Sequence, residues 1–174
     1  MQKGVRMSFE GLFARLKESL AGVTDSAGRL RVVAEEIAAY YGVRPHEIGL
    51  FSVDVKKHEI TFRWPVSMAK VGHIPLNAVN SLVAKTANEK IASLDNAFAR
   101  TRHLFMFEHM LADKTERITA QKVMSAPIQT DGTVTGVIQV VRKGATAVEA
   151  GDDFTEQNLA DLQRIAAVLG HNRI

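Results

Sequence analysis

The sequence of 174 residues contains no cysteine. Disulfide bonds, thiolate metal sites, cysteine nucleophiles and thioether-linked tetrapyrroles are therefore excluded. The absence fits a reducing compartment, and we expect the protein to be cytoplasmic.

Long hydrophobic runs are also missing, although hydrophobic residues make up 46% of the chain. No window approaches the roughly 20 apolar residues that span a bilayer, and residues 1–6 lack the apolar core of a signal peptide. We therefore expect no signal peptide and no membrane partner.

A strong excess of either charge is lacking too. The chain has 22 Lys and Arg against 19 Asp and Glu, a formal net charge of +3. The basic residues form neither a run nor a recognisable DNA-binding motif, so we expect no nucleic-acid partner.

The spacings of catalytic and metal sites are absent as well. His103 and His109 are six residues apart, which separates them on a helix, although on a strand they would share a face. Ser125 has no Gly-x-Ser-x-Gly elbow around it, and the spacing of Gly132 and Gly136 matches neither dinucleotide-binding nor Walker loops. We expect no metal, no cofactor and no enzyme activity.

Two β-branched runs that flank Asp131-Gly132 predict an antiparallel hairpin over residues 122–129 and 134–141. The second run is nearly continuous in Val and Ile, so we expect it to lie inside a sheet. Pro127 lacks an amide donor, which places the first run at a sheet edge or at a bulge.

Helical patterns stand at both ends of the chain. The first predicted helix follows Ser8 as N-cap and ends at Gly22, and the second covers residues 27–41 and ends at Gly42. The first helix carries a stripe of large apolar residues at helical spacing: Phe9, Leu12, Phe13, Leu16 and Leu20.

The C-terminal helix is predicted from its start signals. With Thr155 as N-cap, Phe154 and Leu159 occupy the two positions of a hydrophobic staple, and Glu156 meets the positive end of the helix dipole. This helix extends to about Leu169.

The middle of the chain predicts strands at residues 48–55, 59–64 and 71–76, followed by a helix over 78–90 that Asn77 caps. We expect the inner face of that helix to consist of Val79, Leu82, Val83 and Ala87. Residues 93–119 are the least regular, and their apolar run at 104–111 fits a helix or a strand.

The segment MSAPIQTDGTVTGVIQVVRKG, followed by DFTEQNLADLQRIAAVLG, resembles the last two core strands and the closing helix of a GAF domain. The upstream pieces GHIPLN, NSLVAKTANE and LDNAF resemble the middle of such a domain, so the likeness covers about Leu30 to Gly170. It implies an α+β (α/β) fold whose central antiparallel sheet carries the N- and C-terminal helices on one face and the middle segment on the other. We divide the chain into an N-terminal helix at 1–29 and a GAF-like domain at 30–174.

The resemblance also implies a function, because GAF domains sense small molecules and associate through their helices. We expect a non-catalytic sensor with an unknown small molecule held between the sheet and the middle segment. The candidate lining residues are Phe62, Trp64, Phe98, Arg102, His103, Phe105, Phe107 and Met124. Alternatively, these side chains fill the core, and the domain is a ligand-free protein-interaction module.

Known activities of the family do not carry over to this chain. Family members that reduce methionine sulfoxide use cysteines, which are absent here. The Asn-Lys…Phe…Asp-Glu pattern of cyclic-nucleotide-binding members is also missing. We read Arg63, Arg100 and Arg102 as a solvated face in preference to an anion clamp.

The apolar stripe of the first helix predicts a homodimer. Each large side chain contributes roughly 1.5 to 3 kcal/mol when fully buried, and a twofold helical bundle would bury the stripe. The alternative is that the helix folds back fully onto its own domain. A signal would pass to a partner in trans or through the geometry of the dimer.

Overall fold

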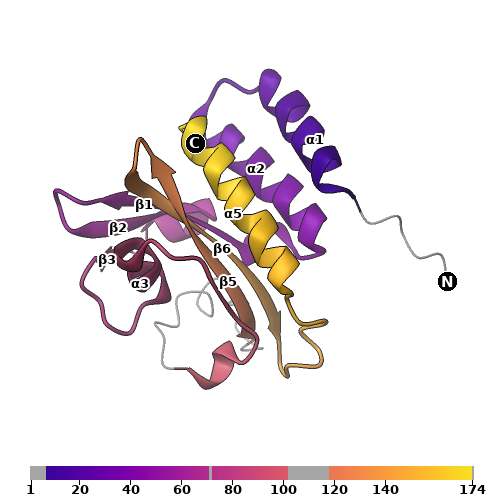
Figure 1. Ribbon diagram of the computed structural model, residues 1–174, viewed down its shortest axis with the longest axis vertical. Helices are drawn as coiled ribbons and strands as arrows, with labels where there is room; N and C mark the ends of the chain where they lie inside the picture. Colours follow the sequence, from indigo (N-terminus) through magenta and orange to yellow (C-terminus); the bar gives the residue numbers. More distant parts are fainter. Residues whose placement is uncertain (1–6, 71, 102–117, 174) are drawn as a thin grey trace.

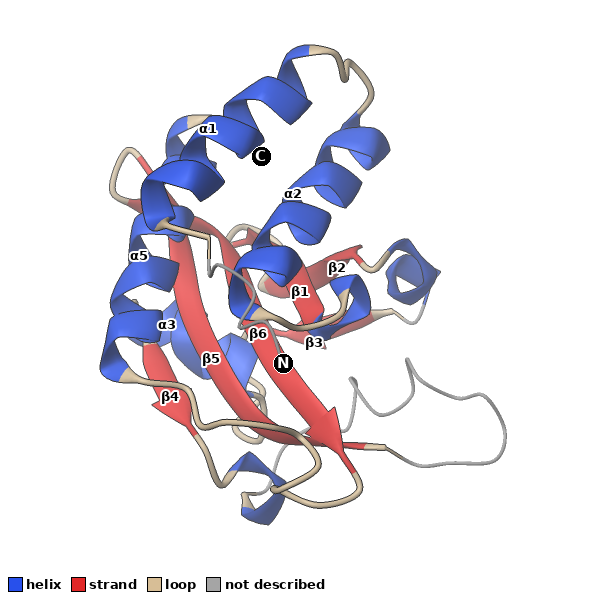
Figure 2. Cartoon of the chain, turned by 90° about the vertical axis from the view of Figure 1, so that its right-hand side faces the viewer, coloured by secondary structure: helices blue, strands red, loops and turns tan. Residues whose placement is uncertain are grey.

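The computed structural model describes residues 7–70, 72–101 and 118–173. Within them, six strands form one antiparallel sheet in the order β3-β2-β1-β6-β5-β4, with helices on both faces (Figures 1 and 2). The strands are β1 (Ile48–Asp54), β2 (Glu59–Trp64), β3 (His73–Pro75), β4 (Ser93–Asp95), β5 (Thr119–Thr130) and β6 (Thr133–Gly144). The predicted α+β class with a central antiparallel sheet is confirmed.

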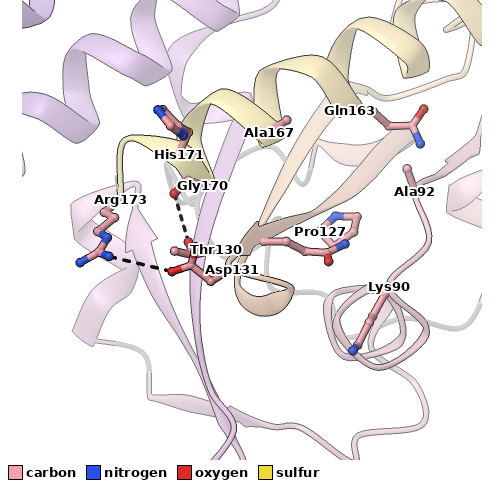
Figure 3. Close-up of a pocket in the computed structure, with 11 residues that line it drawn as sticks. Lys90, Ala92, Pro127, Thr130, Asp131, Gln163, Ala167, Gly170, His171 and Arg173 are labelled. Carbon is pink, nitrogen blue, oxygen red and sulfur yellow. Dashed lines mark hydrogen bonds and ion pairs between the residues drawn. The ribbon is translucent and has the colours of Figure 1, made fainter.

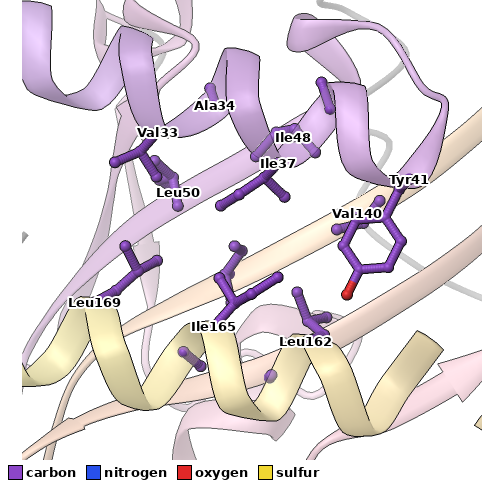
Figure 4. Packing of buried hydrophobic residues seen from close by; sticks show 14 of the residues in the cluster. Val33, Ala34, Ile37, Tyr41, Ile48, Leu50, Val140, Leu162, Ile165 and Leu169 are labelled. Carbon is purple, nitrogen blue, oxygen red and sulfur yellow. The ribbon is translucent and has the colours of Figure 1, made fainter. Parts of the chain in front are cut away.

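Three long helices lie on one side of the sheet: α1 (Phe9–Ala21), α2 (Ser26–Tyr41) and α5 (Glu156–His171). Helices α2 and α5 pack directly on the strands, and α1 lies on the outer side of α2 (Figure 1). The core between them is built from aliphatic side chains, including Val33, Ile37, Leu50, Ile165 and Leu169 (Figure 4). The prediction that both terminal regions supply helices to one face is confirmed.

The ends of these helices follow the predicted caps. Ser8 Oγ accepts a hydrogen bond from the N–H of Gly11 at 3.1 Å, and Gly42 ends α2 with a φ of 65°. Thr155 Oγ1 accepts from the N–H of Asn158 at 3.1 Å, while Asn158 Oδ1 accepts from the N–H of Thr155 at 3.0 Å. Thr155 is therefore the N-cap of α5, as predicted, and forms a reciprocal capping box.

The opposite face of the sheet carries helix α3 (Leu82–Glu89) and the short 3-10 turns η2 (Val66–Lys70) and η3 (Phe98–Arg100). A further 3-10 turn, η1 (Pro45–Glu47), leads into β1. The second core cluster lies on this face and includes Phe51, Ile60, Phe62, Val83 and Phe98.

The predicted start of α3 was wrong. The helix begins at Leu82 because Ser81 Oγ accepts from the N–H of Ala84 at 3.3 Å, while the N–H groups of Ala78 and Ser81 are engaged in two successive turns. Val79 is 94% exposed and does not belong to the inner face. The buried hydroxyl of Ser81 provides the cap that we had assigned to Asn77.

The long hairpin of β5 and β6 is confirmed. Asp131 and Gly132 form its turn with φ values of 51° and 78°, which are the left-handed conformations of a type I′ turn. Strand β6 lies between β1 and β5, inside the sheet. Strand β4 pairs with β5 only over residues 123–125, so Pro127 lies beyond that pairing, next to a register shift after Ile128.

A bulge between β1 and β2 changes which face the aromatic residues occupy. Leu50 pairs with Trp64 and Phe51 pairs with Phe62, so Arg63 is an extra residue on β2. Phe62 therefore joins the core on the α3 face, whereas Trp64 packs against the helical core. The sequence had predicted that both rings lie on one face.

Helix α1 shares the core of the rest of the chain. Phe9, Leu12 and Leu16 are 7%, 0% and 5% exposed, and they cluster with side chains of α2 and α5. The guanidinium carbon of Arg164 lies 3.7 Å from the centre of the Phe9 ring. The predicted boundary after residue 29 thus crosses one continuous core, and three side chains of the stripe are already covered by their own chain.

Candidate functional site

The face of the sheet beneath α3 is mainly apolar. The rings of Phe51 and Phe62 are tilted relative to each other with their centres 4.5 Å apart, and Phe98 from η3 joins the same cluster. Val123 and Val141 complete the floor from β5 and β6. Together with aliphatic side chains, these residues form a buried apolar layer between the sheet and α3.

A polar cluster lies within this apolar face. Ser125 and Gln139 are cross-strand partners on β5 and β6, and Thr86 reaches them from α3. Ser125 Oγ and Thr86 Oγ1 are 2.7 Å apart, and Gln139 Nε2 donates to Ser125 Oγ at 3.2 Å. Ser125 is 0% and Gln139 and Thr86 are 2% exposed.

The chemistry of this Thr86–Ser125–Gln139 cluster is limited to hydrogen bonding. Hydroxyl and amide groups donate and accept hydrogen bonds, but none of them changes its charge near neutral pH. The cluster therefore offers hydrogen-bonding groups but no acid, no base and no metal ligand.

The structure separates the predicted lining residues. Phe62 and Phe98 lie on the α3 face, where they are 1% and 6% exposed. Trp64 lies on the helical side and donates from Nε1 to the carbonyl of Pro45 at 2.9 Å. Met124 is also in the helical core, because it alternates with Val123 along β5. Arg102, His103, Phe105 and Phe107 lie outside the described residues.

The polar cluster was not predicted from the sequence, although a signal for it was present. Ser125 and Gln139 interrupt two apolar runs at positions that face inward, and a buried polar side chain needs a hydrogen-bond partner. We had considered Ser125 only as a nucleophile. Its partner Thr86 lies within the predicted helix, three positions after Val83, but was not assigned to the inner face.

A second buried polar centre joins η1 to β6. The carboxylate of Glu47 accepts from the N–H of Arg44 at 2.7 Å, from Arg44 Nε at 3.2 Å and from the N–H of Lys143 at 2.9 Å. Burial acts to raise the pKa of Glu47, but these hydrogen bonds outweigh it and hold the pKa below the usual 4.5. Burial and the neighbouring charges of Arg44 and Lys143 lower the pKa of His46.

Two tyrosines beside this centre connect α2 to α5. Tyr40 donates from its hydroxyl to Asp161 Oδ2 at 2.7 Å, and Tyr41 donates to the carbonyl of Asn158 at 3.0 Å. Burial, reinforced by the charge of Asp161, raises the pKa of the Tyr41 hydroxyl. Because these groups are all used in holding the helices together, we assign them a structural role.

A groove of about 530 Å³ lies between the end of α5 and the β5–β6 hairpin (Figure 3). Within it Thr130 Oγ1 donates to the carbonyl of Gly170 at 3.1 Å, and Arg173 and Asp131 form an ion pair at 4.0 Å. A Cβ on Gly170 would collide with the carbonyl of Gln129, so α5 and β5 are in close contact here. The polar groups of the groove tie the helix to the hairpin.

Within the part of the chain that the structure describes, no group of three or more His, Cys, Asp or Glu side chains could hold a metal ion. His103 and His109 lie outside the described residues. Of the described helices, none is long and apolar enough to cross a membrane.

No family model and no curated protein matches the chain. Solved structures do match at the level of the fold. The GAF domain of a Coxiella burnetii phosphoenolpyruvate-protein phosphotransferase has a TM-score of 0.71 at 12% identity, covering 95% of this chain and 92% of that one. The GAF domain of the corresponding Acinetobacter protein has a TM-score of 0.67 at 15% identity, covering 94% and 90%.

A third similar structure is the free methionine-R-sulfoxide reductase of Neisseria meningitidis in complex with its substrate. Its TM-score is 0.63 at 16% identity, and the alignment covers 94% of this chain and 86% of the reductase. The alignments with the two GAF domains cover almost the whole chain and therefore include the six-stranded sheet. At such low identity, the likeness shows the architecture, and this chain has the GAF fold.

Proposed function

We propose that the protein is a non-catalytic sensor domain that binds a small molecule on the α3 face of its sheet. The observation that carries the proposal is the Thr86–Ser125–Gln139 cluster, buried within an apolar floor. An apolar surface with a few convergent polar groups is the usual form of a ligand site.

The kinds of protein in which a similar fold occurs support this proposal. Similar structures include GAF domains of phosphotransferases, a methyl-accepting chemotaxis protein and a reductase in complex with its substrate. The cluster contains no titratable group, and the sequence has no cysteine that could serve the redox chemistry of a reductase. Binding without catalysis is therefore the role that we assign.

The proposed site differs from the set predicted from the sequence. It keeps Phe62 and Phe98 and adds Thr86, Ser125 and Gln139, which approach each other from α3, β5 and β6. Trp64 and Met124 are left out because they face the helices.

A metabolite library screened by thermal shift tests the proposal. A ligand of this site should raise the melting temperature of the unmodified protein and should lose most of its effect on Ser125→Ala. The matched control is Ser67→Ala, the same change on the exposed turn η2. A hit that stabilises all three proteins equally would bind elsewhere and would count against the site.

The alternative is a ligand-free protein-interaction module, and one observation favours it. Phe62 and Phe98 are 1% and 6% exposed, so their rings already fill the space above the sheet. A library without a single stabilising compound, together with a folded and monodisperse protein, would support this second function.

We also propose that the protein acts as a cytoplasmic homodimer and signals to a partner in trans. Phe13 and Leu20 are half-buried and remain available on α1, whereas the other three residues of the stripe pack within the chain. A dimer built on α1 would therefore use a smaller apolar surface than the sequence suggested.

A further inference from the structure

A cavity of about 550 Å³ opens on the helical side of the sheet, away from the Thr86–Ser125–Gln139 cluster. It lies where the N-terminus of α2, the bulged part of β1 and β2, the β5–β6 hairpin and the segment after α5 come together. These elements are far apart in the sequence, and the three long helices and the hairpin meet near this end of the molecule (Figure 1).

The lining of this cavity is basic. Arg29, Arg63 and Arg173 contribute to it, and no acidic residue does. Within the described part of the chain, the guanidinium of Arg29 has no hydrogen-bond or ion-pair partner, and Arg63 has only the hydroxyl of Ser26, which accepts from its Nη2 at 3.1 Å. Guanidinium groups pair with carboxylates and phosphates through two parallel hydrogen bonds, so the lining suits an oxyanion.

The β-bulge explains how Arg63 reaches this position. Arg63 is the extra residue between the pairs Leu50–Trp64 and Phe51–Phe62. Bulges redirect side chains and are frequent next to functional sites. Here, the redirected guanidinium reaches the first residue of α2, so the sequence reading of Arg63 as part of a solvated face is incomplete.

The first turn of α2 adds positive potential to the same place. Ser26 and Arg29 both belong to this turn, and the N-terminus of a helix of 16 residues carries a partial positive charge. Two carboxylates lie nearby. Asp25 caps α2, because its Oδ1 accepts a hydrogen bond from the N–H of Gly28 at 2.7 Å. Asp131 forms an ion pair with Arg173 at 4.0 Å, and both side chains are largely exposed. Such an exposed pair is weak and leaves Arg173 able to exchange partners.

The rest of the lining is apolar. Leu30, Leu50 and Ile128 contribute side chains from α2, β1 and β5 and continue into the helical core. A bound molecule would therefore meet guanidinium groups at one end and aliphatic groups at the other. We propose that this cavity binds a small anion with an apolar body, in which a carboxylate or phosphate meets the arginines.

Isothermal titration calorimetry of the whole protein with simple amphiphiles tests this second site. The anionic probes are octanoate and octyl phosphate, and octanol and inorganic phosphate supply each half of the ligand alone. The anionic amphiphiles should bind more tightly than either half. Removing one guanidinium in Arg29→Met or Arg63→Met should weaken them ~10-fold.

The matched control is Arg31→Met. Arg31 lies on the same helix two residues from Arg29, is exposed and pairs with Glu35 at 3.4 Å outside the cavity. This variant has the same net charge as Arg29→Met and should bind the probes as the unmodified protein does. If Arg31→Met weakened probe binding as much as Arg29→Met does, the effect would be one of general electrostatics and the proposal would be overturned. Failure of both anionic probes to bind at low millimolar concentration would also overturn it.

The two proposed sites can be told apart. Ser125→Ala should leave octanoate binding unchanged, because Ser125 lies on the other face of the sheet. Loss of octanoate binding in a folded Ser125→Ala protein would contradict the separate site. A tighter affinity for octyl phosphate than for octanoate would identify the headgroup as phosphate, and the reverse order would identify it as carboxylate.

Discussion

At the level of single residues, Glu47 is a buried charged group that joins two elements of the fold. Its side chain is 4% exposed and accepts hydrogen bonds from Arg44 and from the backbone of Lys143. A buried carboxylate is stable only with such partners. It fixes η1, the segment between α2 and β1, onto the end of β6.

The first prediction concerns Glu47→Gln. Removing the charge should lower the free energy of unfolding by about 2 to 3 kcal/mol, because the charge-assisted hydrogen bonds from Arg44 and Lys143 are weakened. Urea denaturation at neutral pH measures this change. The exposed control Glu89→Gln should stay within about 0.5 kcal/mol of the unmodified protein.

The pH dependence of this effect has a definite sign. The folded-state pKa of Glu47 lies below the usual 4.5, so its stabilisation is complete above that pH and is lost as the pH falls through the folded-state pKa. The difference between the unmodified protein and Glu47→Gln should therefore shrink below about pH 4.5. A constant difference at lower pH would show that packing, and not charge, accounts for the loss.

At the scale of elements, the helices are held by contacts at their ends as well as by their apolar faces. Helix α5 begins at a reciprocal capping box and ends against β5, where Gly170 touches the backbone of Gln129. The start and the end of this helix can be tested separately.

At the start of α5, Thr155→Ala should cost about 1 kcal/mol, because the N–H of Asn158 loses its acceptor. Thr155→Ser and Thr155→Asp keep an oxygen at the cap and should retain the stability of the unmodified protein. Thermal denaturation followed by circular dichroism compares the three variants. An unchanged midpoint in the alanine variant would show that the cap contributes nothing.

At the end of α5, Gly170→Ala should destabilise the fold by roughly 1 to 3 kcal/mol, since the new methyl group must push the helix away from the carbonyl of Gln129. The control is Gly22→Ala at the end of α1, where the φ is −98° and no atom lies within 4 Å of the new Cβ. Chemical denaturation of both variants gives the comparison, and equal effects would contradict the close contact.

Many helix ends and turns could be predicted from the sequence because the signals for them are local. Caps at Ser8 and Thr155, the stop at Gly42 and the turn at Asp131-Gly132 all depend on residues within a few positions of each other. The start of α3 failed because two capping residues, Asn77 and Ser81, compete within one turn. Burial of Ser81 decides between them, and burial is a tertiary property.

The candidate site was less predictable because faces of a sheet depend on register. The extra residue Arg63 moves Trp64 to the helical side, and no local signal in β2 announces a bulge. One register shift was enough to divide the predicted aromatic set between two cores. Polar residues inside apolar runs, such as Ser125 and Gln139, are the sequence signal that indicates a buried polar cluster.

At the scale of the whole molecule, the GAF fold offers two chemically different surfaces on opposite faces of one sheet. The α3 face holds uncharged polar groups in a mainly apolar floor, and the helical side holds the cavity lined by three arginines. Helix α1 packs on α2, and its apolar side chains Phe13 and Leu20 remain half-buried.

The assembly prediction is that the protein forms a homodimer through Phe13 and Leu20. Light scattering at tens of micromolar should give the mass of a dimer, and Phe13→Asp with Leu20→Asp should give a folded monomer, because both side chains are only half-buried. Leu12→Asp is the contrasting variant and should impair folding, since Leu12 is 0% exposed. A monomeric unmodified protein would contradict the dimer.

The proposed binding of a small molecule on the α3 face can be tested by an amide NMR titration with the hits of the metabolite screen. We predict a hit that shifts the amide signals of Thr86, Ser125 and Gln139 in slow or intermediate exchange and leaves the amide signal of Arg29 unchanged. A complete screen without such a hit, or with hits that shift only signals around Arg29 and Arg63, would contradict the claim.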